Sequence, residues 1–144
     1  MMKVKIKKLH PEVKIPLKAT KEAACADVYA TEILKDEIQK YNVTVKLGFS
    51  TEIPNGYKGI IVPRSSFTHK GWVMQNSPAQ IDSDYRGEWM IKFESLDDYL
   101  PFPYKVGDRV AQIFFEKVVD YEFEEVTEVA VSERGEGGFG STGK

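Results

Sequence analysis

The chain has 144 residues, enough to bury one hydrophobic core and short for two, so we expect one folded domain. Its hydrophobic fraction of 42% and charged fraction of 29% are ordinary for a globular protein, and no apolar run is long enough to span a bilayer, which argues against a membrane protein. The net charge of -2 argues against general nucleic-acid binding, which needs a concentrated basic surface, but a few local arginines would suffice for a small polyphosphate.

The N-terminal residues 1–8 alternate charged and aliphatic side chains and lack the continuous apolar core of a secretory signal. The single cysteine, Cys25, cannot form an internal disulfide and offers no zinc-binding spacing. Both features predict an intracellular, cytoplasmic protein.

Alternation of apolar and polar residues with a period of two predicts short, half-buried strands. It is clearest at Val4 and Ile6, at Val43, Val45, Leu47 and Phe49, and at Trp89, Ile91 and Phe93. Turn-forming residues at 54–56, 83–87 and 106–108 separate these stretches, and none has the period of a long amphipathic helix. We therefore expect an all-β fold, a jelly roll or distorted β-barrel with at most one short helix.

Three local features qualify this pattern. Residues 65–70 are the best candidate for the short helix, with Ser65 as its N-cap and a start that attracts phosphate. Residues 110–115 are apolar on both faces and predict a fully covered strand, in which Gln112 needs a polar partner. Residues 133–144 are mostly glycine, serine and charged residues, and predict a mobile arm on a domain formed by residues 1–132.

Five stretches between Ala24 and Gly143 resemble, in order, the five signature motifs of the trimeric dUTPase family. They read Ala24-Cys25-Ala26-Asp27-Val28-Tyr29-Ala30; Pro63-Arg64-Ser65-Ser66; Ile81-Asp82-Ser83-Asp84-Tyr85-Arg86-Gly87; Gly107-Asp108-Arg109-Val110-Ala111-Gln112; and Arg134-Gly135-Glu136-Gly137-Gly138-Phe139-Gly140-Ser141-Thr142-Gly143. The resemblance implies a dUTPase-like fold and the hydrolysis of dUTP to dUMP and pyrophosphate, which limits uracil incorporation in DNA and supplies dUMP for thymidylate synthesis. It also implies Mg²⁺ as cofactor and a homotrimer.

In the third motif, Asp82 is similar to the family's carboxylate that deprotonates the attacking water, a role needed because water is a poor nucleophile at neutral pH. Tyr85 is similar to the tyrosine that packs under the deoxyribose and leaves no room for a ribose 2′-hydroxyl. Without the resemblance, a polar turn with backbone-capping carboxylates explains the stretch equally simply. For Arg86, a role in the site and a structural ion pair remain equal alternatives.

Asn76 lies where the family reads the edge of uracil through a carboxamide. The following residues 77–80 depart from the family's more apolar, glycine-containing run, and a turn asparagine is the alternative. In the second motif, the resemblance assigns Arg64, Ser65 and Ser66 to the phosphates, where charge develops on the leaving pyrophosphate. Gln112 is assigned to phosphate oxygens too, with a purely structural buried glutamine as the alternative.

Asp27 is expected to be an exposed carboxylate on a short strand, and the resemblance implies that it holds Mg²⁺ through water. In the arm, the family's phenylalanine stacks on uracil and its arginine contacts the γ-phosphate. These roles correspond to Phe139 and Arg134, with Gly140, Ser141 and Thr142 donating to phosphates. The run from Gly138 to Lys144 also fits the start of a P-loop, but no helix-forming segment follows it.

Two rival functions remain. A dCTP deaminase has a similar fold, but that family places a catalytic glutamate five residues after the turn glycine, where this chain has Lys92. A non-catalytic binding protein could use the same scaffold, although loss of function usually removes the chemical residues first. In the family, each site takes its first, second and fourth motifs from one subunit, the third from a neighbour and the arm from the remaining one, so we expect an isolated subunit to be inactive.

Overall fold

The computed structural model describes residues 2–36, 41–97 and 100–138. Its strands are β1 (Lys5–Lys8), β2 (Ala26–Tyr29), β3 (Glu32–Lys35), β4 (Asn42–Lys46), β5 (Phe49–Glu52), β6 (Tyr57–Val62), β7 (Trp72–Met74), β8 (Ala79–Ile81), β9 (Met90–Ser95) and β10 (Arg109–Lys117). One 3₁₀ turn, η1 (Ser65–Phe67), is the only helical element in this part of the chain. The all-β prediction is confirmed.

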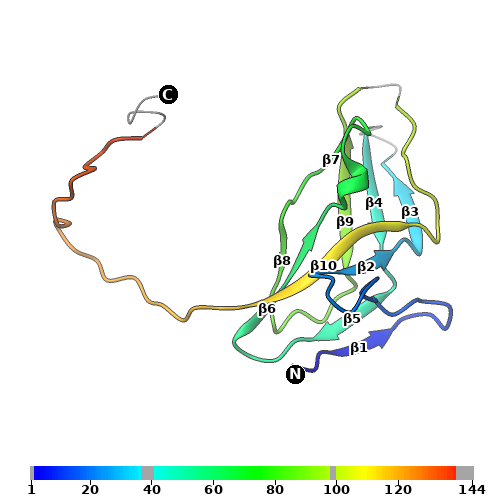
Figure 1. The fold of residues 1–144 in the computed structure, drawn as a ribbon, viewed down its shortest axis with the longest axis horizontal. Helices are drawn as coiled ribbons and strands as arrows, with labels where there is room; N and C mark the ends of the chain where they lie inside the picture. The colour runs from blue at the N-terminus through cyan, green and yellow to red at the C-terminus, as the bar shows by residue number, and fades with distance from the viewer. Residues whose placement is uncertain (1, 37–40, 98–99, 139–144) are drawn as a thin grey trace.

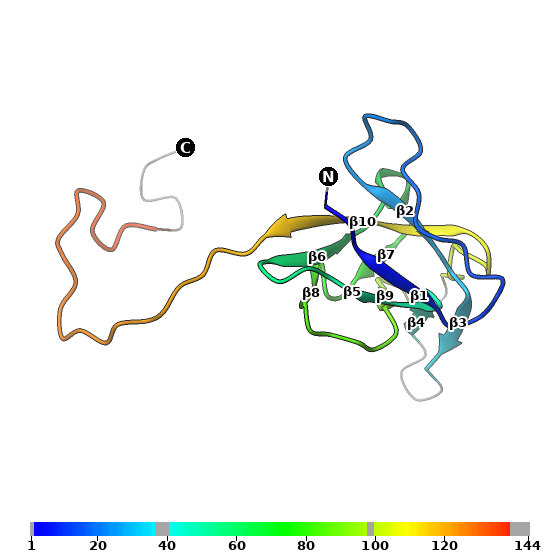
Figure 2. The ribbon, with the colours of Figure 1, turned by 90° about the horizontal axis from the view of Figure 1, so that it is seen from below.

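The strands form three antiparallel sheets (Figures 1 and 2). Their orders are β1-β5, β2-β10-β6-β8 and β3-β4-β9-β7. The two four-stranded sheets enclose a core that contains Trp89, Phe49 and Phe93. The Trp89 indole N–H donates to the Thr51 hydroxyl at 3.1 Å, so the largest buried side chain leaves no polar atom unpaired.

The alternation at residues 43–49 divides between two sheets. Val43 and Val45 lie on β4, whereas Phe49 begins β5, and all three are buried. Between them, Leu47 donates its N–H to the Trp89 carbonyl and Gly48 has a φ of +73°, so the chain turns from one sheet into the other without losing its inward face. The predicted strand around Trp89, Ile91 and Phe93 is found as β9.

The helix expected over residues 65–70 is shorter than predicted, and Ser65 does not cap it. The extended residue before η1 is Arg64, and no side chain caps the turn. His69 has a φ of +62°, a left-handed conformation that cannot continue a right-handed helix. Phe67 is buried and stacks on Tyr104 with ring centroids 5.8 Å apart, which anchors η1 to the core.

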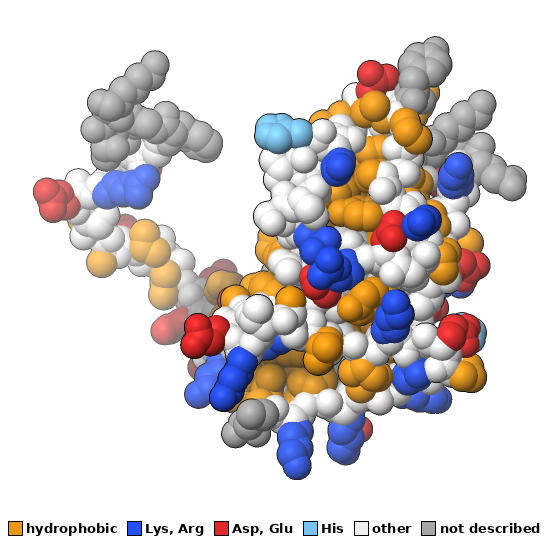
Figure 3. Space-filling model, turned by 45° about the vertical axis from the view of Figure 1, so that its right-hand side comes forward, with side chains coloured by type: hydrophobic (Ala, Val, Ile, Leu, Met, Phe, Trp, Pro, Cys, Tyr) orange, Lys and Arg blue, Asp and Glu red, His pale blue; other side chains and the backbone are white. Residues whose placement is uncertain are grey.

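Beyond Lys117 the described chain leaves the body as an extended segment, residues 118–138 (Figures 1 and 2). Its apolar side chains stand in solvent: Phe123 is 93% exposed and Val131 is 100% exposed. In the space-filling view this segment stands clear of the body (Figure 3). The boundary between residues 132 and 133 stays a prediction.

Among the described residues, no helix is long and apolar enough to cross a membrane.

Candidate active site

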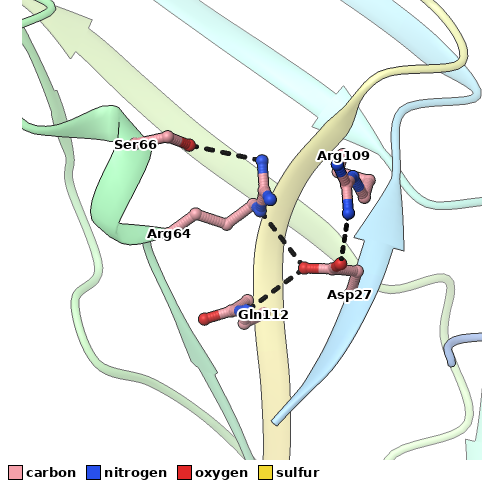
Figure 4. A network of polar contacts seen from close by, with 5 residues as sticks. All are labelled: Asp27, Arg64, Ser66, Arg109 and Gln112. Carbon is pink, nitrogen blue, oxygen red and sulfur yellow. Dashed lines mark hydrogen bonds and ion pairs between the residues drawn. The ribbon is translucent and has the colours of Figure 1, made fainter. Parts of the chain in front are cut away.

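The Asp27 carboxylate is the centre of a polar network on the sheet β2-β10-β6-β8 (Figure 4). Its Oδ1 accepts from Arg64 Nε and Gln112 Nε2, and its Oδ2 accepts from Arg109 Nη1, each at 3.2 Å. Asp27 is 4% exposed. The expectation of an exposed carboxylate is therefore wrong, because the donors on β10 and after β6 cover it.

The strand register explains how these side chains meet. Asp27 on β2 pairs with Gln112 on β10, and Gln112 pairs on its other side with Val62 on β6. Arg64 follows the end of β6 by two residues and folds back over this row. Gln112 thus has the polar partner that its apolar strand demands.

Arg109 lies in the fourth motif and is one of the local arginines that could serve a polyphosphate, but the sequence assigned it no individual contact in the network. Residues 109 and 112 are three apart, so a regular strand would point them to opposite faces. The register between β10 and β2 shifts between Arg109 and Ala111, and this β-bulge turns the Arg109 side chain to the face of Gln112. A bulge has no reliable sequence pattern, which is why the contact was missed.

The two serines of the second motif lie in the turn that follows Arg64. Its Nη1 donates to Ser66 Oγ at 3.2 Å, while the Ser65 carbonyl accepts from the Thr68 N–H and hydroxyl. Burial raises the pKa of Tyr104 below this turn, and the Arg64 charge partly opposes the shift. Arg64 and Ser66 are thus joined to the Asp27 network (Figure 4). Ser65, like Ser66, is exposed.

Asn76 and Tyr85 line a cavity of about 220 Å³. Ile81 and Met90 share this lining, which the sequence had not indicated. The Tyr85 hydroxyl donates to the Glu88 carbonyl at 3.1 Å, so the ring is held back against its own turn. The cavity combines an amide, an aromatic ring and apolar side chains, a lining that suits a flat ring with polar edges.

Arg86 closes the same turn. Its Nη1 donates to the carbonyls of Ser83 at 2.7 Å and Tyr85 at 3.1 Å. Both bonds go to backbone oxygens, so Arg86 stabilises the turn itself.

Asp82 follows β8 and lines a separate, wider hollow of about 960 Å³. This hollow also takes in Lys58, Asp84 and residues 117–121. The backbone carbonyl of Asp82 accepts from the Tyr85 N–H at 3.2 Å, which sets the turn.

One chain does not bring Asp82 to the Asp27 network. Ile81 pairs with Gly59 on β6, whereas Gln112 pairs with Val62, three residues further along that strand. At a rise of about 3.3 Å per residue, Ile81 and Gln112 are about 10 Å apart along β6. Asp82 follows Ile81 on the side that points away from Gln112, which increases the separation. A water held by Asp82 and a phosphate held by Arg64 of the same chain would thus lie well beyond hydrogen-bonding reach of each other.

The arm is described only up to Gly138. Within it, Arg134 Nε donates to the Gly137 carbonyl at 2.8 Å. The predicted contacts of Phe139, Gly140, Ser141 and Thr142 lie outside the described residues.

The described residues hold no group of three or more His, Cys, Asp or Glu side chains that could bind a metal ion by themselves. A carboxylate has about four acceptor positions, and Asp27 uses three of them on Arg64, Gln112 and Arg109. The remaining position fits one water of a hydrated ion, whereas direct coordination would displace one of these donors.

Comparison with known proteins gives a consistent match. The family model described as dUTPase matches residues 11–143. A deoxyuridine 5′-triphosphate nucleotidohydrolase of Nautilia profundicola is 43% identical over 99% of this chain and 100% of its own length, and one of Leptospira interrogans is 42% identical over 99% of both. The structure of the Staphylococcus bacteriophage 80alpha dUTPase with dUpNHpp is similar with a TM-score of 0.78 and 25% identity, and covers 99% of each chain.

Proposed function

The chain belongs to the dUTPase family, and from this membership we propose that it hydrolyses dUTP to dUMP and pyrophosphate. The observation that carries the proposal is the network around Asp27, which joins residues of the first, second and fourth motifs. In a cell this activity would limit uracil incorporation in DNA and supply dUMP for thymidylate synthesis.

The charge of the network supports a polyphosphate ligand. Two guanidinium groups share one carboxylate, which leaves a net positive charge. The side chain of Arg64 is 21% exposed, so it keeps N–H groups near solvent. Guanidinium N–H groups beside a hydroxyl such as Ser66 suit phosphate oxygens.

In the mechanism that we propose, Asp82 orients and deprotonates a water for in-line attack on the α-phosphorus. Arg64, Ser65, Ser66 and Gln112 hold the phosphates and stabilise the charge on the departing pyrophosphate. Asn76 reads uracil in the cavity that it shares with Tyr85, which packs under the deoxyribose. The arm closes over the nucleotide through Arg134, Phe139, Gly140, Ser141 and Thr142.

We propose Mg²⁺ as the cofactor, arriving with the nucleotide. Mg²⁺ binds oxygen ligands and keeps several waters, and it would neutralise charge on the triphosphate. The single acceptor position left on Asp27 supports contact through a water.

A homotrimer explains how Asp82 reaches the phosphates. Because the Asp82 turn and the Asp27 network are separated within one chain, a neighbouring subunit would have to supply one of them. The exposed apolar residues at 118–131 support assembly too, since a long unpaired apolar segment is unusual on a monomer. Their cover would come from another copy.

A nucleotide panel tests the proposed function. With Mg²⁺, pyrophosphate should be released from dUTP much faster than from dTTP, dCTP or UTP, and a chelator should remove most of the activity because the triphosphate loses its charge neutralisation. Pyrophosphate and dUMP are measured together. Ammonia release from dCTP at a similar rate, or no turnover of dUTP, would contradict the proposal.

The sugar selectivity depends on Gly87. A Cβ added there would lie 2.3 Å from the Tyr85 hydroxyl oxygen, so Gly87→Ala must push the ring away from its turn. We expect the kcat/KM preference for dUTP over UTP to fall about tenfold, the selectivity typical of one steric contact in a pocket. The ratio of the two kcat/KM values is the measurement.

Gly56→Ala is the matched control. Gly56 has a φ of +80° and open space where a Cβ would lie, so alanine strains the backbone by about 1 kcal/mol without touching Tyr85. Thermal unfolding should reveal this cost while the dUTP/UTP preference stays at the parent value. Equal losses of selectivity in both variants would mean that general destabilisation, rather than the position of Tyr85, controls the sugar preference.

A further inference from the structure

We propose that Arg109 is a positioning residue of the polyphosphate site and acts through Asp27. Its ion pair with the carboxylate fixes the group that in turn orients Arg64 and Gln112. This inference rests on the proposed function and adds to it a residue that has no role in the mechanism above.

The first argument is the division of the carboxylate between its donors. Arg109 donates to Oδ2, whereas Arg64 and Gln112 both donate to Oδ1, all at 3.2 Å. With both oxygens held from opposite sides, the carboxylate cannot rotate about its Cβ–Cγ bond without breaking a charge-assisted bond. The direction of the Arg64 guanidinium therefore depends on Arg109, which does not contact Arg64 itself in Figure 4.

The second argument is the bulge. A β-bulge interrupts ladder pairing, and here it falls between Arg109 and Ala111. Its effect is to place Arg109 and Gln112 on the same carboxylate although they are three residues apart. β-bulges often occur where a strand directs a side chain into a functional site, so the bulge here indicates a function for Arg109 beside Asp27.

The third argument is the chain of contacts that continues from Arg64. Its Nε holds Asp27 while its Nη1 donates to Ser66 Oγ. The Nε side of the guanidinium is thus held by the buried Asp27 carboxylate, and the Nη1 side is directed to Ser66. Loss of Arg109 would free the carboxylate and disturb Arg64 and Gln112 together, although Arg109 lies on the far side of Asp27.

The competing explanation is that Arg109 only ties β10 to β2. Lys46 provides a matched comparison, because its ammonium forms a 2.7 Å ion pair with Glu32 across β4 and β3, outside the site. A simple strand tie at either place should affect unfolding and leave ligand binding unchanged.

The experiment compares Arg109→Gln and Lys46→Gln by calorimetric titration with α,β-imido-dUTP and with dUMP. Arg109→Gln should weaken binding of the triphosphate analogue about tenfold and of dUMP less than about threefold, since Arg64 and Gln112 act on the polyphosphate. KM for dUTP should rise by a similar factor, and kcat should fall as well, because Arg64 and Gln112 also stabilise the charge on the departing pyrophosphate. Lys46→Gln should change neither affinity.

A double-mutant cycle shows whether Arg109 acts through Asp27. Adding Arg109→Gln to Asp27→Asn should cause no further loss of affinity, since the arginine no longer has a carboxylate to hold. If Arg109→Gln alone fails to fold, the comparison of Asp27→Asn with the double variant still tests the inference. Additive losses, or unchanged affinity of Arg109→Gln for the analogue, would overturn the inference. Failure of the parent protein to hydrolyse dUTP would instead overturn the proposed function.

Discussion

Asp82→Asn should lower kcat for dUTP by about 10³-fold, within the range for removing a general base. Asparagine keeps the size of the side chain and the backbone bond from the Tyr85 N–H to the residue 82 carbonyl, so the turn should remain intact. It cannot accept the proton of the attacking water. KM should stay within about threefold of the parent value, because the loss falls on the transition state. Pyrophosphate release under saturating dUTP with Mg²⁺ is the measurement.

Asp84→Asn is the control for this variant. Asp84 lies two residues away, in the same turn, and lines the same hollow as Asp82. Its replacement removes an equal charge from the same place and should leave kcat within about twofold of the parent, as for an ordinary surface substitution. Equal rates for Asp82→Asn and the parent would remove Asp82 from the mechanism and leave the family assignment standing.

Two inactive variants should restore activity when their chains are mixed. One variant carries Asp82→Asn and keeps Arg64. The other carries Arg64→Gln and keeps Asp82. If a site takes Arg64 from one chain and Asp82 from its neighbour, random assembly of equal amounts gives about one intact site in four. Mixed chains refolded together should therefore show about a quarter of the parent activity, far above either variant alone.

The separation of the two groups along β6 is the reason for this expectation. Each variant refolded by itself is the control for the procedure, and gel filtration gives the size of the active species. No recovery from a mixture that contains mixed oligomers, or full activity in a monomer, would show that a single chain completes its own site.

The sequence predicted the strands well because their alternation is a local property. Ile91 and Phe93 face the core on β9 as their spacing indicates, and Val43 and Val45 do so on β4. The short helix was overestimated, since residue types alone do not show that the turn ends at Phe67 or that His69 takes a left-handed conformation.

The candidate site was harder to predict, because its contacts join distant parts of the chain. Asp27 and Arg109 are 82 residues apart, and the spacing of Arg109 from Gln112 argues against a common face. The motif order predicted Asp27, Arg64 and Gln112 as site residues, but neither the burial of the carboxylate nor the bulge beside it follows from residue type. For Asp82 and Asn76, the resemblance predicts a role for each residue, and the fold places them in two separate cavities.

If another copy covers the extended segment, as we propose, a newly made chain would stand without that cover until it assembles. Phe123 and Val131, which are almost fully accessible, would then belong to an unfolded-like apolar stretch of the kind that chaperones and proteases recognise. The lifetime of an unassembled chain would then depend on how soon it meets its partners, so low expression would reduce the protein's abundance more than in proportion to its synthesis.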